Sequence, residues 1–240
     1  FMKKHIPNAL TLLNLLMGSI AVVMIMEDRP QVAVVLVLVA ALLDFMDGMA
    51  ARLLRAYSPT GKVLDSLADM VSFGLVPALF VYKIFLFQLE VADPDSLCAQ
   101  PWVAPIIKLS PLLIPLFSAI RLARFSVAED DGDFFRGLPV PAHTLFWTGI
   151  FSQILTTGAL YGQMVYIWFI GTILVMFSVM MIIPLPMLSL KFHSFGFREN
   201  LFRYIVLAGG LVILGILGLS GLPLVILLYI LLSLFRIVLT

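Results

Sequence analysis

Residues 43–74, LDFMDGMAARLLRAYSPTGKVLDSLADMVSFG, place four aspartates inside apolar sequence that is long enough to cross a membrane. Ionised side chains at membrane depth are costly and usually functional. Four of them in so short a span indicate a bound cation or a reaction. The aspartates are Asp44, Asp47, Asp65 and Asp69.

Helical spacing groups these acids on two faces, because residues three or four apart lie on the same side of a helix. The two faces are Asp44, Asp47, Gly48 and Ala51 on one helix, and Gly61, Asp65 and Asp69 on the next. Pro59 disfavours a helical residue before it and is accepted at a helix start, so residues 57–60 can reverse the chain. Two antiparallel helices then bring the acids together. Hard oxygen ligands suit Mg²⁺, Mn²⁺ or Ca²⁺ rather than zinc or copper.

Small and basic residues accompany the acids. Gly48, Ala51 and Gly61 share the acidic faces, where a missing side chain leaves room for a ligand or a second backbone. Arg52 and Lys62 border the same region and can offset phosphate charge, arginine in a bidentate manner. This combination predicts a substrate that contains a diphosphate.

The complete pattern, Asp44-x2-Asp47-Gly48-x2-Ala51-Arg52-x8-Gly61-x3-Asp65-x3-Asp69, resembles the signature of the CDP-alcohol phosphotransferases. These membrane enzymes move a phosphatidyl-type group from a CDP-activated lipid to an alcohol. The resemblance implies that Asp44, Asp47 and Asp65 hold a divalent metal, Mg²⁺ or Mn²⁺, as two ions. It also implies that Asp69 is a further metal ligand or the general base toward the acceptor hydroxyl. Small residues and one arginine would accommodate the cytidine and its phosphates: Gly48, Ala51, Gly61 and Arg52.

Sequence outside the signature resembles the phosphatidylserine synthases of this family. The matching segments are residues 6–18, 64–74, 121–125 and 135–142. Glycerophosphate-using relatives tend to have Asp-Pro and Ala-Asp-Lys where this chain has Asp65-Ser66 and Ala68-Asp69-Met70. The resemblance implies CDP-diacylglycerol and L-serine as substrates, with phosphatidylserine and CMP as products. Inositol phosphate and glycerol phosphate remain alternative acceptors.

Three further arginines are candidates for holding the lipid phosphate or the serine carboxylate: Arg121, Arg124 and Arg136. The first two are three residues apart and share a helix face. Arg136 lies in a loop flanked by glycine and proline. Basic residues at a cytoplasmic helix end also follow from topology alone, which is the alternative explanation for Arg121 and Arg124.

The composition predicts an all-α protein of the membrane bilayer. Of 240 residues, 62% are hydrophobic and 12% charged, and the mean hydropathy is +1.10. We predict a single polytopic integral membrane domain, residues 1–240. Residues 6–190 form a six-helix catalytic core in this prediction, and residues 201–240 an additional hairpin. About eight transmembrane helices are expected, at 6–26, 32–54, 62–87, 106–125, 145–160, 164–184, 204–219 and 222–239.

Basic residues favour one side of this topology. The side of the N-terminus carries Lys3, Lys4, Arg52, Arg55, Lys62, Arg121, Arg124, Arg136, Lys191, Arg198, Arg203 and Arg236, twelve of the fifteen lysines and arginines. This is the positive-inside pattern, so we expect the N-terminus and the aspartates at the cytoplasmic face of a bacterial inner membrane. No basic stripe with interleaved aromatic residues is present, which excludes nucleic acid as an expected partner.

Two alternatives compete with the enzyme hypothesis. The aspartates could pair structurally with Arg52, Arg55 and Lys62. They could instead form the ion site of a cation-coupled transporter, which predicts acids near the membrane midplane in broken helices. Separately, small residues in the last hairpin permit close helix packing and make a homodimer the expected assembly. They are Gly209, Gly210, Gly215 and Gly218.

Overall fold

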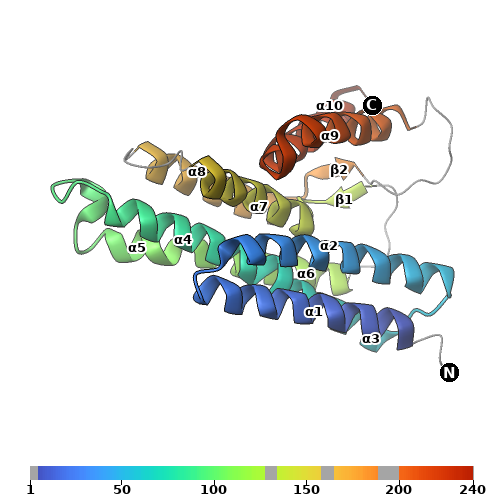
Figure 1. Ribbon diagram of the computed structural model, residues 1–240. Coiled ribbons are helices and arrows are strands. Elements are labelled where there is room, and N and C mark those ends of the chain that lie inside the picture. The colour runs from blue at the N-terminus through green and yellow to red at the C-terminus, as the bar shows by residue number, and fades with distance from the viewer. Residues whose placement is uncertain (1–4, 128–133, 158–164, 189–199, 240) are drawn as a thin grey trace.

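Apolar runs bounded by polar turns form long helices, and Pro30 and Pro59 each occupy the first turn of the helix that they begin. The computed structural model describes residues 5–127, 134–157, 165–188 and 200–239. Its helices lie alongside one another in a bundle (Figure 1). They are α1 His5–Met26, α2 Pro30–Leu53, α3 Pro59–Asp69, α4 Val76–Glu90, α5 Ala104–Leu109, α6 Leu113–Val127, α7 Val140–Thr157, α8 Val165–Ile182, α9 Leu201–Leu217 and α10 Leu222–Leu239.

The helices confirm an all-α integral membrane protein. Among the described residues, five helical stretches are long and apolar enough to cross a membrane: His5–Met26, Pro30–Leu53, Pro59–Glu90, Ala104–Ser126 and Leu201–Arg236. The last stretch comprises α9 and α10, which are joined by the 3-10 turn Gly218–Gly221. Helix α8 is apolar but shorter.

The predicted third helix, residues 62–87, is longer than expected and irregular. It extends from Pro59 to Glu90, with a π-helical turn, Met70–Leu75, between α3 and α4. A π-turn disturbs the regular backbone hydrogen bonds of a helix. Thr144 Oγ1 of α7 donates to Phe73 O at 2.7 Å and so satisfies one carbonyl of this turn.

A short antiparallel ribbon interrupts the otherwise helical chain. Strand β1, Phe134–Arg136, pairs with β2, Pro186–Leu188, and the ribbon lies next to α10 (Figure 1). Strands of three residues are too short to produce a recognisable alternation of polar and apolar residues. Their partner is also distant in sequence, so no local hairpin signal marks them.

Helix α1 packs against its neighbours through one face. The buried residues of α1 are Pro7, Thr11, Asn14, Gly18, Ala21 and Ile25. Their spacing alternates between four and three, which is the period of left-handed helix packing. A Cβ atom added at Gly18 would lie 2.2 Å from Ser72 Oγ and 2.8 Å from Ser72 Cα. Glycine at this position therefore allows α1 to touch the π-turn.

We expect Gly18→Ala to lower the free energy of unfolding by about 1–3 kcal/mol, because the added methyl group overpacks a backbone contact. The measurement is the midpoint of thermal unfolding in detergent. Gly171→Ala on α8 is the matched control, since no atom of the described part of the chain lies within 4 Å of a Cβ placed there. A Gly18→Ala midpoint equal to that of the parent protein would contradict the packing argument.

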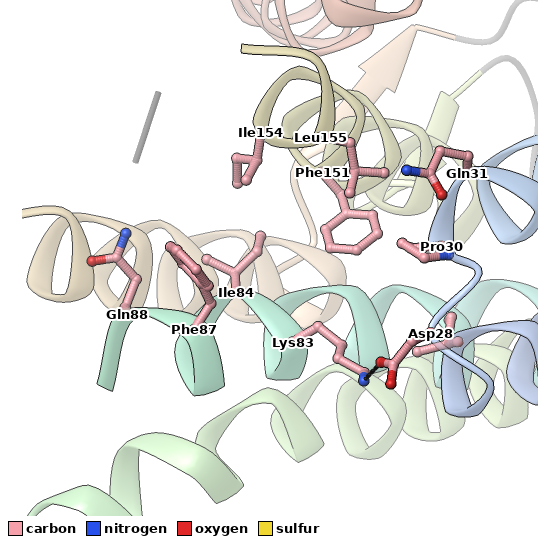
Figure 2. A pocket seen from close by; sticks show the side chains of 11 residues that line it. Asp28, Pro30, Gln31, Lys83, Ile84, Phe87, Gln88, Phe151, Ile154 and Leu155 are labelled. Atoms are coloured by element: carbon pink, nitrogen blue, oxygen red, sulfur yellow. Dashed lines mark hydrogen bonds and ion pairs between the residues drawn. The ribbon is translucent and has the colours of Figure 1, made fainter. Parts of the chain in front are cut away.

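A cavity of about 380 Å³ lies between the α1–α2 turn, α4 and α7 (Figure 2). Its walls include Ile84, Phe87 and Phe151, and Lys83 Nζ lies 2.5 Å from Asp28 Oδ1 at its edge. Asp28 precedes α2, whereas the signature begins at Asp44 in the second half of that helix, about 20 Å away at 1.5 Å per residue. The cavity is therefore separate from the acidic residues.

Candidate active site

The turn between α2 and α3 is built by local backbone chemistry. Arg55 adopts a positive φ of 49°, which turns the chain out of α2. Ser58 caps α3, and its hydroxyl oxygen accepts a hydrogen bond from Gly61 N at 3.0 Å. Pro59 follows in the first turn, where its missing N–H leaves no hydrogen bond unmade. Helix α3 can therefore return alongside the end of α2.

This turn brings Asp44 and Asp47 of α2 toward Asp65 of α3. One carboxylate oxygen from each of the three lies within 4.8 Å of the others. Asp47 is buried, and Asp44 and Asp65 are half-buried. Three carboxylates this close repel one another in apolar surroundings unless a cation lies between them. Their oxygen chemistry and mutual distances fit a divalent metal ion such as Mg²⁺ or Mn²⁺.

The neighbouring cations do not neutralise these acids. In the described part of the chain, no ion pair joins the four aspartates to a lysine or an arginine. Arg52 Nε donates to Gly48 O at 3.1 Å. Lys62 Nζ lies 5.8 Å from the centre of the Phe125 ring. The alternative of structural pairing with these basic residues is therefore not supported.

Asp69 lies one helical turn after Asp65 and is held by a different partner. Its side chain is only 7% exposed, and its Oδ1 accepts a hydrogen bond from Asn14 Nδ2 at 3.4 Å. Asp69 is within electrostatic range of the other three acids but is not one of the three whose oxygens converge. The site thus contains three convergent carboxylates and a fourth, buried carboxylate beside them.

Helix α1 supplies two polar contacts to the acids that the spacing of its residues does not predict. Thr11 Oγ1 donates to Asp47 Oδ2 at 2.6 Å, and Asn14 binds Asp69 as described above. Ser72 Oγ in turn donates to Asn14 O at 3.1 Å. The available signal was the position of Thr11, Asn14 and Gly18 on one face of an otherwise apolar helix. Spacing within α1 could not indicate which acids that face would meet.

The small residues of the signature have different surroundings. Among the described residues, a Cβ atom at Gly48 would meet only Arg52 Nη2, at 3.8 Å, so space is open beside the acids. At Gly61 an added Cβ would lie 2.9 Å from Ser58 Oγ and 3.0 Å from Asn8 Oδ1. Gly61 therefore permits two side chains to approach α3 closely. Ala51 is half-buried on α2.

The three candidate arginines are placed differently. Arg121 of α6 is within electrostatic range of Asp69, and its Nε is buried without a hydrogen-bond partner among the described residues. Arg124 is exposed, and its Nη1 donates to Ile182 O at 3.2 Å. Arg136 ends β1, where its backbone pairs with Pro186; its side chain lies outside the described part of the structure. Of the three, Arg121 is the candidate with a buried donor that has no partner among the described residues.

Comparison with known proteins adds to this geometry. Residues 4–186 match the family model of the CDP-alcohol phosphatidyltransferases. The chain is 32% identical over 202 residues to CDP-diacylglycerol–serine O-phosphatidyltransferase of Mycobacterium bovis, covering 81% of this chain and 64% of that protein. The protein of the same name from Bacillus subtilis is 32% identical over 137 residues, covering 57% of this chain and 70% of its own length. Archaetidylserine synthase of Methanothermobacter thermautotrophicus is 31% identical over 156 residues, covering 62% of this chain and 60% of that protein. The chain therefore spans somewhat less than two thirds of the mycobacterial relative.

Proposed function

The chain belongs to the CDP-alcohol phosphatidyltransferase family, and on this premise we propose that it transfers the phosphatidyl group of CDP-diacylglycerol to the hydroxyl of L-serine. The products are phosphatidylserine and CMP. The observation that carries the proposal is the convergence of Asp44, Asp47 and Asp65, whose oxygens lie within 4.8 Å of one another inside the family signature. Relatives named for serine transfer support the choice of acceptor.

We infer that Asp44, Asp47 and Asp65 hold Mg²⁺ or Mn²⁺, as two ions, with Asp69 as a further ligand or as the base. Bound divalent metal neutralises a diphosphate and stabilises the departing CMP. The protein's part is to fix the carboxylates before the substrate arrives. The backbone turn at Pro59 and the hydroxyl of Thr11 do so here.

The residues of the chain carry the proton and orient the reactants. The serine hydroxyl oxygen forms a bond to the phosphatidyl phosphorus, and the bond from that phosphorus to the CMP phosphate oxygen breaks. Asp69 accepts the hydroxyl proton as general base. Asn14 Nδ2 holds the carboxylate of Asp69 in place for this transfer.

Thr11 is expected to tune the metal site without touching the substrate. Replacing Thr11 by Val removes the 2.6 Å hydrogen bond to Asp47 Oδ2 while keeping the size of the side chain. Loss of such an outer contact typically weakens metal affinity by about 10- to 100-fold. We expect this loss in Mn²⁺ titrations followed by electron paramagnetic resonance. Ser19→Ala is the control, since Ser19 lies exposed on the same helix and its hydroxyl donates to Leu15 O of that helix. Equal Mn²⁺ affinity in the Thr11→Val variant and the parent would contradict the assigned role.

The remaining signature residues accommodate the nucleotide in this proposal. Gly48 leaves open space next to the acids, and Ala51 follows it on the same helix face. Arg52, exposed at the end of α2, offsets phosphate charge. Gly61 has no side chain and so leaves room for Ser58 and Asn8 at the start of α3. Lipid phosphate or the serine carboxylate would be held by the candidate arginines, Arg121, Arg124 and Arg136.

We further propose the topology and assembly expected from the sequence. Residues 6–190 form the catalytic core, and residues 201–240 add a hairpin, giving eight spans in total. The N-terminus and the acids face the cytoplasm of a bacterial inner membrane, as the distribution of lysine and arginine indicates. A homodimer is the proposed assembly. Gly209 and Gly210 approach Leu228 and Val225 within the hairpin, so they are occupied by packing inside the chain.

A cation-coupled transporter is the alternative from another functional class. It predicts acids near the membrane midplane in broken helices, whereas Asp44 and Asp47 lie in the second half of α2, on the side of the α2–α3 turn. The open space beside the acids at Gly48 suits a bound substrate better than an ion alone. Within the enzyme class, inositol phosphate and glycerol phosphate are the competing acceptors.

An acceptor comparison tests the proposed function. Purified protein receives CDP-diacylglycerol and Mn²⁺, with L-serine, glycerol 3-phosphate and inositol phosphate in separate reactions. We expect CMP release and a new aminophospholipid with L-serine alone. Faster transfer to either phosphorylated acceptor would overturn the serine assignment while leaving the family and the metal site in place.

A further inference from the structure

A proline accounts for the irregular turn that follows the proposed base. In a regular helix each N–H donates to the carbonyl group four positions earlier, so the donor expected for Phe73 O is the N–H of residue 77. Residue 77 is Pro77, which has no N–H and whose ring crowds that same carbonyl group. The backbone forms the π-turn Met70–Leu75 at this point, and Val76 N donates to Val71 O, five positions earlier. Pro77 thus leaves the carbonyl group of Phe73 without its regular helical donor.

Helix α7 supplies a donor in its place. Thr144 Oγ1 donates to Phe73 O at 2.7 Å, and both residues are fully buried. The same hydroxyl lies 3.0 Å from Val140 O, one turn earlier in α7, so the contact with Phe73 is the shorter of the two. A buried carbonyl group without a donor is costly. Thr144 therefore stabilises the turn from a different helix.

Helix α1 connects the same turn to Asp69. Ser72 Oγ donates to Asn14 O at 3.1 Å, and Asn14 Nδ2 donates to Asp69 Oδ1 at 3.4 Å. Gly18 allows this close approach, since an added Cβ would lie 2.8 Å from Ser72 Cα. Asn14 therefore binds the turn through its backbone and the proposed base through its side chain. A change in the turn reaches Asp69 by two routes, along the helix and through Asn14.

The place of Asp69 in the chain makes its direction depend on this turn. Asp69 is the last residue of α3 and directly precedes the π-turn. A turn with bonds to the fifth residue holds one more residue than a regular turn, so it rotates the side chains before it relative to those after it. The helix that follows is fixed in the core through Val76, Phe80 and Val81, each fully buried. The π-turn therefore determines where the Asp69 carboxylate points.

The three convergent aspartates depend less on the turn. Asp44 and Asp47 belong to α2, which the turn does not interrupt. Asp65 belongs to α3 but lies one helical turn further from the π-turn than Asp69 does. A loosened π-turn is thus expected to displace Asp69 more than the three carboxylates of the metal site.

We propose that Thr144 is a positioning residue for the general base: by holding the carbonyl group of Phe73, it fixes the π-turn that directs the Asp69 carboxylate. This inference rests on the proposed transfer reaction, in which Asp69 accepts the proton of the acceptor hydroxyl, and goes beyond it. Thr144 acts through the backbone and touches neither substrate nor metal in this proposal. Misplacement of a reacting group by about 1 Å can lower a rate by about 10²-fold.

Thr144→Val tests the proposal, because it removes the hydroxyl and keeps the size of the side chain. We expect kcat for CMP release with L-serine to fall about 10- to 100-fold, while the KM for CDP-diacylglycerol and the Mn²⁺ affinity from electron paramagnetic resonance stay within about threefold of the parent values. Thr144→Ser keeps the hydroxyl and is expected to retain most of the parent kcat. Thr148→Val is the matched control, since Thr148 is a fully buried threonine one turn later whose hydroxyl donates to Thr144 O within α7.

The outcomes separate this inference from the proposed function. Parent protein that releases no CMP with any acceptor would overturn both. Active parent protein, with kcat unchanged in Thr144→Val, would overturn only the positioning role. A loss of Mn²⁺ affinity as large as the loss in kcat, or an equal loss of kcat in Thr148→Val, would also contradict that role. If Thr144→Val does not fold, Ser72→Ala provides the test, since it removes the hydrogen bond to Asn14 O; an unchanged kcat there would contradict the proposal.

Discussion

Asp65→Asn is expected to lower kcat for CMP release by about 10³-fold or more. Asp65 contributes one of three carboxylate oxygens that lie within 4.8 Å of one another, and it is the only one of the three from α3. A metal ion supplies several kcal/mol of transition-state stabilisation, and each 1.36 kcal/mol is a factor of about ten in rate. An amide at this position keeps the shape of the side chain but loses the charge that holds the cation.

The measurement combines CMP release with Mn²⁺ binding followed by electron paramagnetic resonance. We expect both to be lost in Asp65→Asn, with the thermal midpoint close to that of the metal-free parent. Asp95→Asn is the matched control, because Asp95 is exposed in the connection between α4 and α5. Full activity of Asp65→Asn at saturating Mn²⁺ would contradict the proposed ligand set.

Asp69→Asn is expected to lower kcat by about 10²–10⁴-fold, the usual contribution of a general base, while Mn²⁺ affinity changes little. The reason is geometric, since Asp69 is not among the three carboxylates that converge and is held instead by Asn14. An asparagine oxygen can still accept the hydrogen bond from Asn14, so the fold around it is preserved. It cannot take a proton from the acceptor hydroxyl.

Metal titration of the Asp69→Asn variant distinguishes the two proposed roles. Retained Mn²⁺ affinity with slow turnover supports the role of a base. Loss of Mn²⁺ affinity comparable to that in Asp65→Asn would contradict it and make Asp69 a metal ligand first. The KM for CDP-diacylglycerol is expected to stay close to that of the parent protein.

Local sequence was sufficient to predict the acidic hairpin. Asp44 and Asp47 are three residues apart, Asp65 and Asp69 are four apart, and Pro59 marks the turn between them. Such spacing places side chains on a helix face whatever the rest of the chain does. The predicted spans at residues 6–26 and 32–54 likewise agree with α1 and α2 to within two residues.

Features that depend on packing were not predictable in this way. The contact of Thr11 with Asp47 joins residues from different helices, and helix propensity carries no information on such pairs. The π-turn at Met70–Leu75 is stabilised by Thr144 of α7, far along the chain. The sequence of α10 does not distinguish Tyr229 from its apolar neighbours, whereas in the structure its hydroxyl donates to Leu188 O of the ribbon.

Metal-dependent transfer to serine is the most direct test of the whole account. Purified protein stripped of metal with a chelator receives CDP-diacylglycerol and L-serine, and CMP and phosphatidylserine are measured as Mn²⁺ or Mg²⁺ is added back. We predict no product without metal and equal amounts of CMP and phosphatidylserine with it. Phosphatidylserine formation that is independent of divalent metal would contradict the central role given to Asp44, Asp47 and Asp65. A failure to form either product at any metal concentration would contradict the proposed activity itself.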